Sequence, residues 1–107
     1  MLYNPKWEAP AVVETVPLEP WRRRLLDAAD YIEAHGWCQG THSDEHGKVC
    51  VVEAITLSGG INEISGRAFR ALCEAVGGNY ASIWNDVPGR TEAEVIATLR
   101  RVAAMEE

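Results

Sequence analysis

Residues 20–36 read PWRRRLLDAADYIEAHG, and this stretch decides the fold class. Its apolar residues recur at steps of three and four, which is the period of one helix face. Pro20 suits a first helical turn, where its missing N–H costs nothing, and Gly36 suits the position just beyond the last turn. The apolar face consists of Trp21, Leu25, Ala28 and Ile32, widened by Leu26 and Ala29. The stretch therefore predicts an amphipathic helix that ends at Gly36.

The sequence beyond Gly36 predicts further helices. Residues 49–57 are nearly all apolar; their β-branched side chains suit a strand, but their spacing and the glycine pair that follows favour a buried helix, which we prefer. Ser65 is the expected N-cap of a helix that ends at Gly77–Gly78. Thr91 and Glu94 form a capping-box pattern at the start of the last helix. We expect an all-α fold, a compact bundle of about four helices.

Two other segments complete the predicted organisation. Residues 1–20 contain four prolines and several valines, so we expect an extended N-terminal arm, anchored by Trp7, before a single helical domain at 21–107. The arm is also where we expect a homodimer contact. Residues 36–48 mix Gly with Ser, Thr and Asp and form one long loop. Loops of this length in small domains are often functional.

Composition limits the classes of function. The chain has 10 Lys and Arg against 16 Asp and Glu, a net charge of −6, which disfavours nucleic-acid binding. We interpret the basic run Arg22–Arg24 as a solvated helix face. No apolar run reaches 18 residues, so we expect no membrane segment. We also see no export signal at the N-terminus and expect a cytoplasmic protein with reduced thiols.

Four potential metal ligands recur at four-residue intervals: Cys38, His42, His46 and Cys50. Two thiolates and two imidazoles can hold structural zinc, but zinc sites usually place a longer spacer between two close pairs. We therefore predict no metal and no cofactor, with the two cysteines packed beneath the loop.

The same loop is compatible with thiol catalysis. Cys38 would be the nucleophile, His42 or His46 the base, and Asn85 or Asp86 the group that orients the base. The structural interpretation is simpler: Asn85 and Asp86 hydrogen-bond the backbone of the turn that they precede.

Two further side chains bear on a site. Glu53 interrupts the apolar run at 49–57, and we expect it to point outward; buried, it would mark a site. We expect Arg90 to pair with Asp86.

Three motifs together resemble those of a known family. They are GWCQG at 36–40, GKVC at 47–50 and WNDVPGRT at 84–91. The chain is similar, from about Trp21 to Ala103, to small proteins that contain a domain of unknown function, found mainly in actinobacterial and phage genomes. The resemblance implies a helical domain and no assigned activity. Glu53 departs from the small residue expected there, which puts a shared packing or pocket in doubt.

We expect an interaction module that binds another protein, with a phage connection implied by the resemblance. The alternative is a small thiol-dependent enzyme or ligand-binding domain, with its site between the 36–48 loop and Trp84–Asp86. The candidate site residues are Trp37, Cys38, Gln39, Glu53, Trp84, Asn85, Asp86 and Arg90.

Overall fold

The computed structural model describes residues 18–78 and 80–105 and has an all-α fold. The predicted arm lies outside the described residues up to position 17, so its anchor and the dimer contact stay predictions. The helices are α2 (Pro20–His35), α3 (Val51–Leu57), α4 (Glu63–Ala75), α5 (Ala81–Asn85) and α6 (Glu92–Ala104). The described part thus contains five helices, because the turn before Trp84 forms a short helix of its own.

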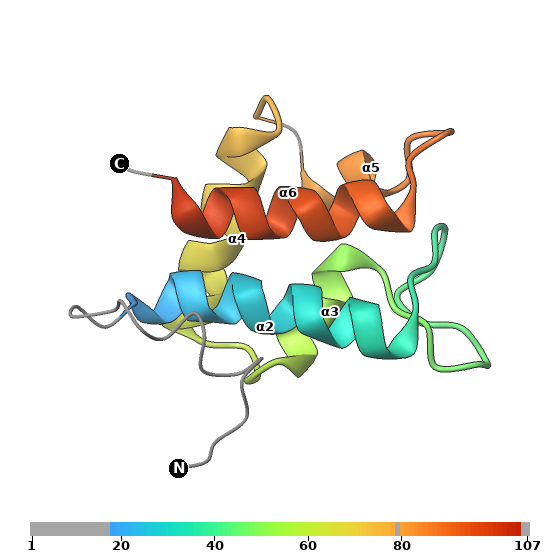
Figure 1. Cartoon of the computed structure of the whole chain (residues 1–107), viewed down its shortest axis with the longest axis horizontal. Helices are drawn as coiled ribbons and strands as arrows, with labels where there is room; N and C mark the ends of the chain where they lie inside the picture. Colours follow the sequence, from blue (N-terminus) through green and yellow to red (C-terminus); the bar gives the residue numbers. More distant parts are fainter. Residues whose placement is uncertain (1–17, 79, 106–107) are drawn as a thin grey trace, which may run out of the picture.

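The two long helices α2 and α6 form the centre of the fold. They lie side by side and run in opposite directions, and α4 crosses one end of the pair (Figure 1). The predicted stripe of α2 is buried as expected, with Leu25, Ala28 and Ile32 fully covered. Val95, Leu99 and Val102 of α6 complete this part of the core. The 36–50 loop and the turn after α5 lie together at the other end of the bundle (Figure 1).

The ends of the helices confirm some predictions and correct others. Gly36 ends α2, with a φ of 102° and its N–H donating to Ile32 O at 2.7 Å. Residues 51–57 are helical as preferred, and Val49 makes only isolated bridges with Trp37 and Ser43. Helices α3 and α4 both end shortly before their glycine pairs.

The predicted N-cap of α4 was wrong. Asn62 caps this helix, accepting the N–H groups of Ile64 and Ser65, and the Ser65 hydroxyl in turn accepts the N–H of Asn62. Ser65 is therefore the other half of a capping box, three residues inside the helix. The sequence pattern placed the start of the helix in the right segment but took Ser65, and not Asn62, for the N-cap.

The interpretation of Arg22–Arg24 as a solvated face was also wrong for Arg24. This side chain is 5% exposed, and its guanidinium donates to Ile55 O at 3.0 Å and Gly60 O at 2.8 Å. Ile55 lies in the last turn of α3, where the helix dipole favours a cation, and Gly60 lies three residues beyond the helix. A Cβ at Gly59 would overlap this guanidinium, which explains one glycine of the pair.

Replacing Arg24 by Met should destabilise the domain by about 2–3 kcal/mol. Methionine keeps most of the aliphatic stem but leaves the carbonyls of Ile55 and Gly60 without their charged donor. Chemical denaturation would measure the loss. Arg23→Met is the matched control, because Arg23 is exposed, and it should change the free energy of unfolding by less than about 0.5 kcal/mol. Equal effects of the two substitutions would contradict a structural role for Arg24.

Candidate functional site

The side chain of Asn85 links the 36–50 loop to α5. It is fully buried, and its Oδ1 accepts the indole N–H of Trp37 at 2.7 Å and the N–H of Val51 at 2.9 Å. Its Nδ2 donates to Cys38 O at 3.2 Å and to Asp86 Oδ1 at 2.9 Å. All four hydrogen-bonding positions of the amide are therefore used. One side chain fixes both ends of the loop.

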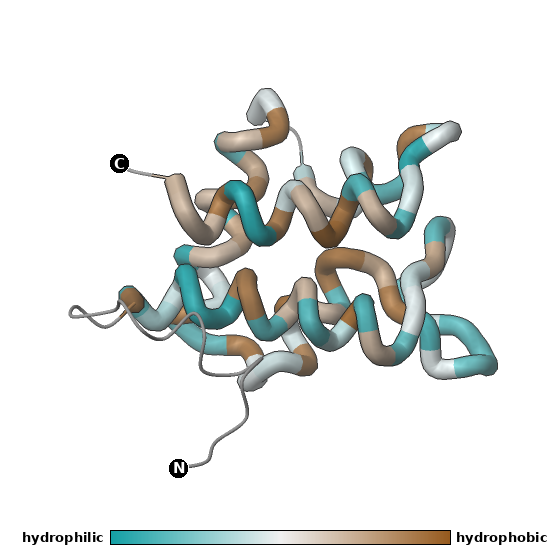
Figure 2. The backbone as a smooth tube through the Cα atoms, in the orientation of Figure 1, coloured by the Kyte–Doolittle hydropathy of each residue, from teal (hydrophilic) through white to brown (hydrophobic). Residues whose placement is uncertain are grey.

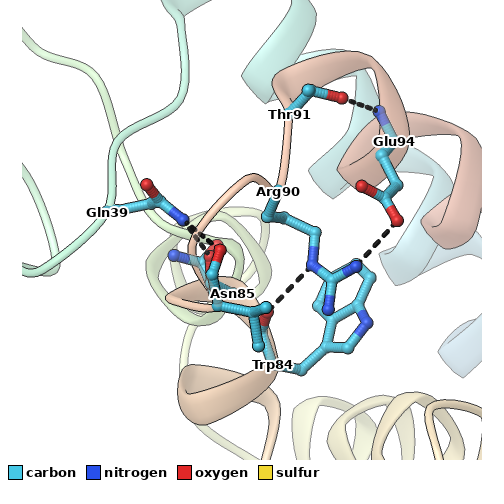
Figure 3. A network of polar contacts seen from close by, with 7 residues as sticks. Gln39, Trp84, Asn85, Arg90, Thr91 and Glu94 are labelled. Atoms are coloured by element: carbon cyan, nitrogen blue, oxygen red, sulfur yellow. Dashed lines mark hydrogen bonds and ion pairs between the residues drawn. The ribbon is translucent and has the colours of Figure 1, made fainter.

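Two neighbouring side chains extend this connection. Gln39 Nε2 donates to the carbonyls of Asn85 and Val87, each at 3.0 Å (Figure 3). Asp86 Oδ1 accepts the N–H of Gly40 at 2.9 Å. Asn85 and Asp86 do accept backbone N–H groups, but the prediction that these belong to their own turn was wrong, because the donors are Val51 and Gly40, 34 and 46 residues earlier. The motifs at 36–40 and 84–86 are in direct contact.

These hydrogen bonds affect the acidity of Asp86. The N–H of Gly40 and then the amide of Asn85 hold the pKa of the Asp86 carboxyl below its ordinary value. Because the pKa is lower in the folded than in the unfolded state, the ionised carboxylate stabilises the fold at neutral pH. This contribution is lost as the pH falls through the folded-state pKa.

Trp84 and Arg90 form a second cluster on the core side of α5. Trp84 is 8% exposed, and the Arg90 guanidinium stacks on its ring at 4.3 Å from the centroid. Arg90 also donates to Trp84 O at 3.0 Å and to Glu94 Oε2 at 2.7 Å (Figure 3). The predicted pairing of Arg90 with Asp86 was wrong. Thr91 caps α6 by accepting the N–H of Glu94, but the Glu94 carboxylate binds Arg90, so only half of the predicted capping box forms.

The two cysteines near the loop have different surroundings. Cys50 is buried and caps α3, its Sγ accepting the N–H of Glu53 at 3.4 Å. Cys38 is only half-buried, which corrects the expectation that both lie beneath the loop, and its Sγ lies 3.5 Å from Lys48 O. Burial raises the pKa of both thiols. Across residues 18–78 and 80–105, no three His, Cys, Asp or Glu side chains come together as metal ligands would.

The remaining sequence candidates contribute little. Glu53 lies half-buried in the first turn of α3, so it is not the buried carboxylate that would mark a site. His42 and His46 are both exposed, and His46 lies 3.5 Å from the carboxylate of Glu45.

Two adjoining hollows lie where the loop meets α5. The deeper one has a volume of about 180 Å³ and is lined by Gly40, Thr41, His42, Cys50, Ser82, Asn85 and Asp86. The shallower one, of about 360 Å³, is lined by Ser82, Ile83, Asp86, Val87 and Pro88. Ser82 and Asp86 line both hollows, and we call the combined surface the α5 face. Cys38 does not line either hollow.

The apolar part of the α5 face was missed in the sequence. Ile83 is 57% exposed and Val87 is 40% exposed. A helix of five residues is too short to show an apolar period, so nothing in the pattern distinguished an exposed isoleucine from a core residue. Figure 2 shows a hydrophobic segment in the turn after α5, next to the mainly hydrophilic 36–50 loop.

A third hollow lies elsewhere, near the start of α2 and the end of α6. Its volume is about 370 Å³, and its lining includes Trp21, Arg67 and Met105. Trp21 contacts two guanidinium groups, those of Arg22 at 4.4 Å and Arg67 at 4.3 Å from its centroid. None of the site residues predicted from the sequence lines this hollow.

Fold and site together define a small helical domain in which one buried amide holds a long polar loop against a short helix. The chain belongs to the family of unknown function DUF6197, whose model matches residues 17–105. This confirms the resemblance to a family with no assigned activity; its motifs, its genomes and the phage connection stay predictions. No curated protein and no solved structure matches the chain significantly. In the described part, no helix has the length and apolar character needed to cross a bilayer.

Proposed function

We propose that this domain is an interaction module that binds another protein through the α5 face. The observation that carries the proposal is a concentration of exposed apolar side chains. Of the seven large hydrophobic residues that are exposed in the described part of the chain, Ile83 and Val87 line this face together, beside Pro88. Contiguous exposed apolar surface with a polar rim is typical of protein-binding sites.

The rigidity of the surface supports the same function. Asn85 and Gln39 join the 36–50 loop and the first residue of α3 to α5 and the turn after it with five hydrogen bonds, so the backbone of the α5 face keeps its position before a partner arrives. Such a surface loses little conformational entropy on binding, which favours affinity.

The nature of the partner follows from charge. A net charge of −6 favours a neutral or basic protein and disfavours nucleic acid. The three free cysteines support a reducing compartment, so we place the module in the cytoplasm. The phage connection rests on the resemblance of the motifs alone.

Thiol catalysis finds less support in the geometry. Nucleophilic cysteines react as thiolates, usually beside a base that lowers the thiol pKa. Cys38 instead has a raised pKa and lies 3.5 Å and 3.6 Å from the carbonyl oxygens of Lys48 and Thr41, which favour the protonated thiol. The thiol that lines the deeper hollow is Cys50, which serves as a helix cap.

A peptide-display selection on the full-length protein tests the proposal. We expect the wild-type protein to enrich peptides that lose at least about tenfold in affinity on Ile83→Asp or Val87→Asp, because a carboxylate there interrupts the apolar contact. Ile61→Asp is the matched control, since Ile61 is 84% exposed and does not line the α5 face. All three variants should keep the wild-type melting temperature.

Two results would contradict this function. One is the absence of any enriched peptide. The other is enrichment of peptides whose affinity falls on Ile61→Asp and not on Ile83→Asp.

A further inference from the structure

The deeper hollow of the α5 face is sized for one side chain. Its volume of about 180 Å³ lies below the roughly 300–1,000 Å³ of pockets that bury a whole small molecule. Ser82 and Asp86 also line the shallower hollow, whose other lining residues are Ile83, Val87 and Pro88. A partner can therefore place one side chain in the deeper hollow and a neighbouring side chain against Ile83, Val87 and Pro88.

The polar lining of the hollow has unused hydrogen-bonding capacity. Asp86 Oδ1 accepts from Gly40 and Asn85, whereas Asp86 Oδ2 has no hydrogen bond to the residues that the structure describes. The hydroxyl of Ser82 likewise has none within the described ranges. Asp86 is the acidic side chain of this lining, which contains no lysine or arginine and has His42 as its one basic side chain. The free oxygens thus form an acceptor site beside a negative charge.

We infer that this hollow binds a basic side chain, an arginine or lysine, that lies next to a large apolar residue in the partner protein. The inference rests on the proposed function and specifies its partner. A guanidinium or ammonium group donates to Asp86 Oδ2 and Ser82 Oγ, while the apolar neighbour covers Ile83 and Val87. Gly40 and Asn85 hold the carboxylate in place before the cation enters.

Asp86→Asn tests the inference without changing the loop. The asparagine Oδ1 can accept the same two hydrogen bonds, while the substitution removes the charge and replaces the accepting Oδ2 by an NH2 group that donates. We expect peptides selected on the wild-type protein to contain Arg or Lys beside an apolar residue and to bind Asp86→Asn about tenfold more weakly. Glu45→Gln is the control, because Glu45 is an exposed loop carboxylate outside the hollow.

A double-mutant cycle measures the interaction between Asp86 and the basic side chain of the peptide. Replacing the peptide arginine by citrulline, or a selected lysine by norleucine, should weaken binding to the wild-type protein and leave binding to Asp86→Asn unchanged. Selected peptides that need Ile83 but bind Asp86→Asn as well as the wild-type protein would overturn the inference and leave the proposed function standing.

Methylguanidinium provides a second probe that needs no peptide. Titrated into the full-length protein, it should shift the amide resonance of Gly40 in the wild type and not in Asp86→Asn. If selection yields no peptide but this shift is seen, the cation site stands and the proposed function falls. Absence of the shift together with absence of basic peptides overturns the inference.

Discussion

Trp84→Ala should destabilise the domain by about 3–5 kcal/mol, the usual cost of removing a large aromatic side chain from a core. The ring is 8% exposed and belongs to the core cluster. Its removal also deprives the Arg90 guanidinium of the surface on which it stacks. A domain of this size loses roughly 4–8 °C of melting temperature per kcal/mol, so thermal denaturation should show a fall of at least about 12 °C.

Thr91→Ala is the matched control for this experiment. It removes the cap of α6 in the same segment and should cost only about 1 kcal/mol. If Trp84→Ala left the melting temperature unchanged while abolishing peptide binding, Trp84 would be a recognition residue and its structural role would be wrong.

Asn85→Ala should lower the free energy of unfolding by about 3–4 kcal/mol, although it removes fewer atoms than Trp84→Ala does. Alanine leaves the buried N–H of Val51 and the indole N–H of Trp37 without an acceptor, and each unsatisfied buried group costs roughly 1–3 kcal/mol. The loss should also be visible locally. The indole N–H resonance of Trp37 should move to the position of a solvent-bonded indole, in a spectrum recorded where the variant is still folded.

Asn62→Ala is the control that distinguishes the linking role of Asn85 from that of an ordinary helix cap. Asn62 accepts two N–H groups at the exposed start of α4, and its replacement should cost about 1 kcal/mol and leave the Trp37 resonance in place. Equal losses for the two asparagine variants would show that Asn85 acts only locally.

The helices could be predicted from the sequence because their signals are local. The α2 stripe, Gly36 and the Thr91 cap each depend on residues within one or two turns, and the structure confirms all three. Arg24 was not predictable in this way, because its partners lie in α3 and at Gly60, more than 30 residues away.

The residues of the candidate site could be predicted from the sequence, but the hydrogen bonds between them could not. Trp37, Gln39, Asn85 and Asp86 were singled out, and the structure brings them together. Sequence spacing cannot show that a turn residue such as Asn85 serves a distant loop. Arg90 has acidic residues on both sides in the sequence, and in the structure it stacks on Trp84, donates to Trp84 O and pairs with Glu94.

The attachment of the loop at its two ends has a consequence for how such domains diversify. Between the attached ends, Asp44 closes a tight turn by accepting the N–H groups of His46 and Lys48, and its own N–H donates to Lys48 O. A replacement turn of different length adds little closure entropy, since doubling a loop costs only about 0.6 kcal/mol. Insertions and substitutions at 43–47 can therefore accumulate without loss of the helical scaffold. The domain is therefore suited to loop grafting: the turn can be replaced by another sequence, while the attached ends of the loop keep it beside the α5 face.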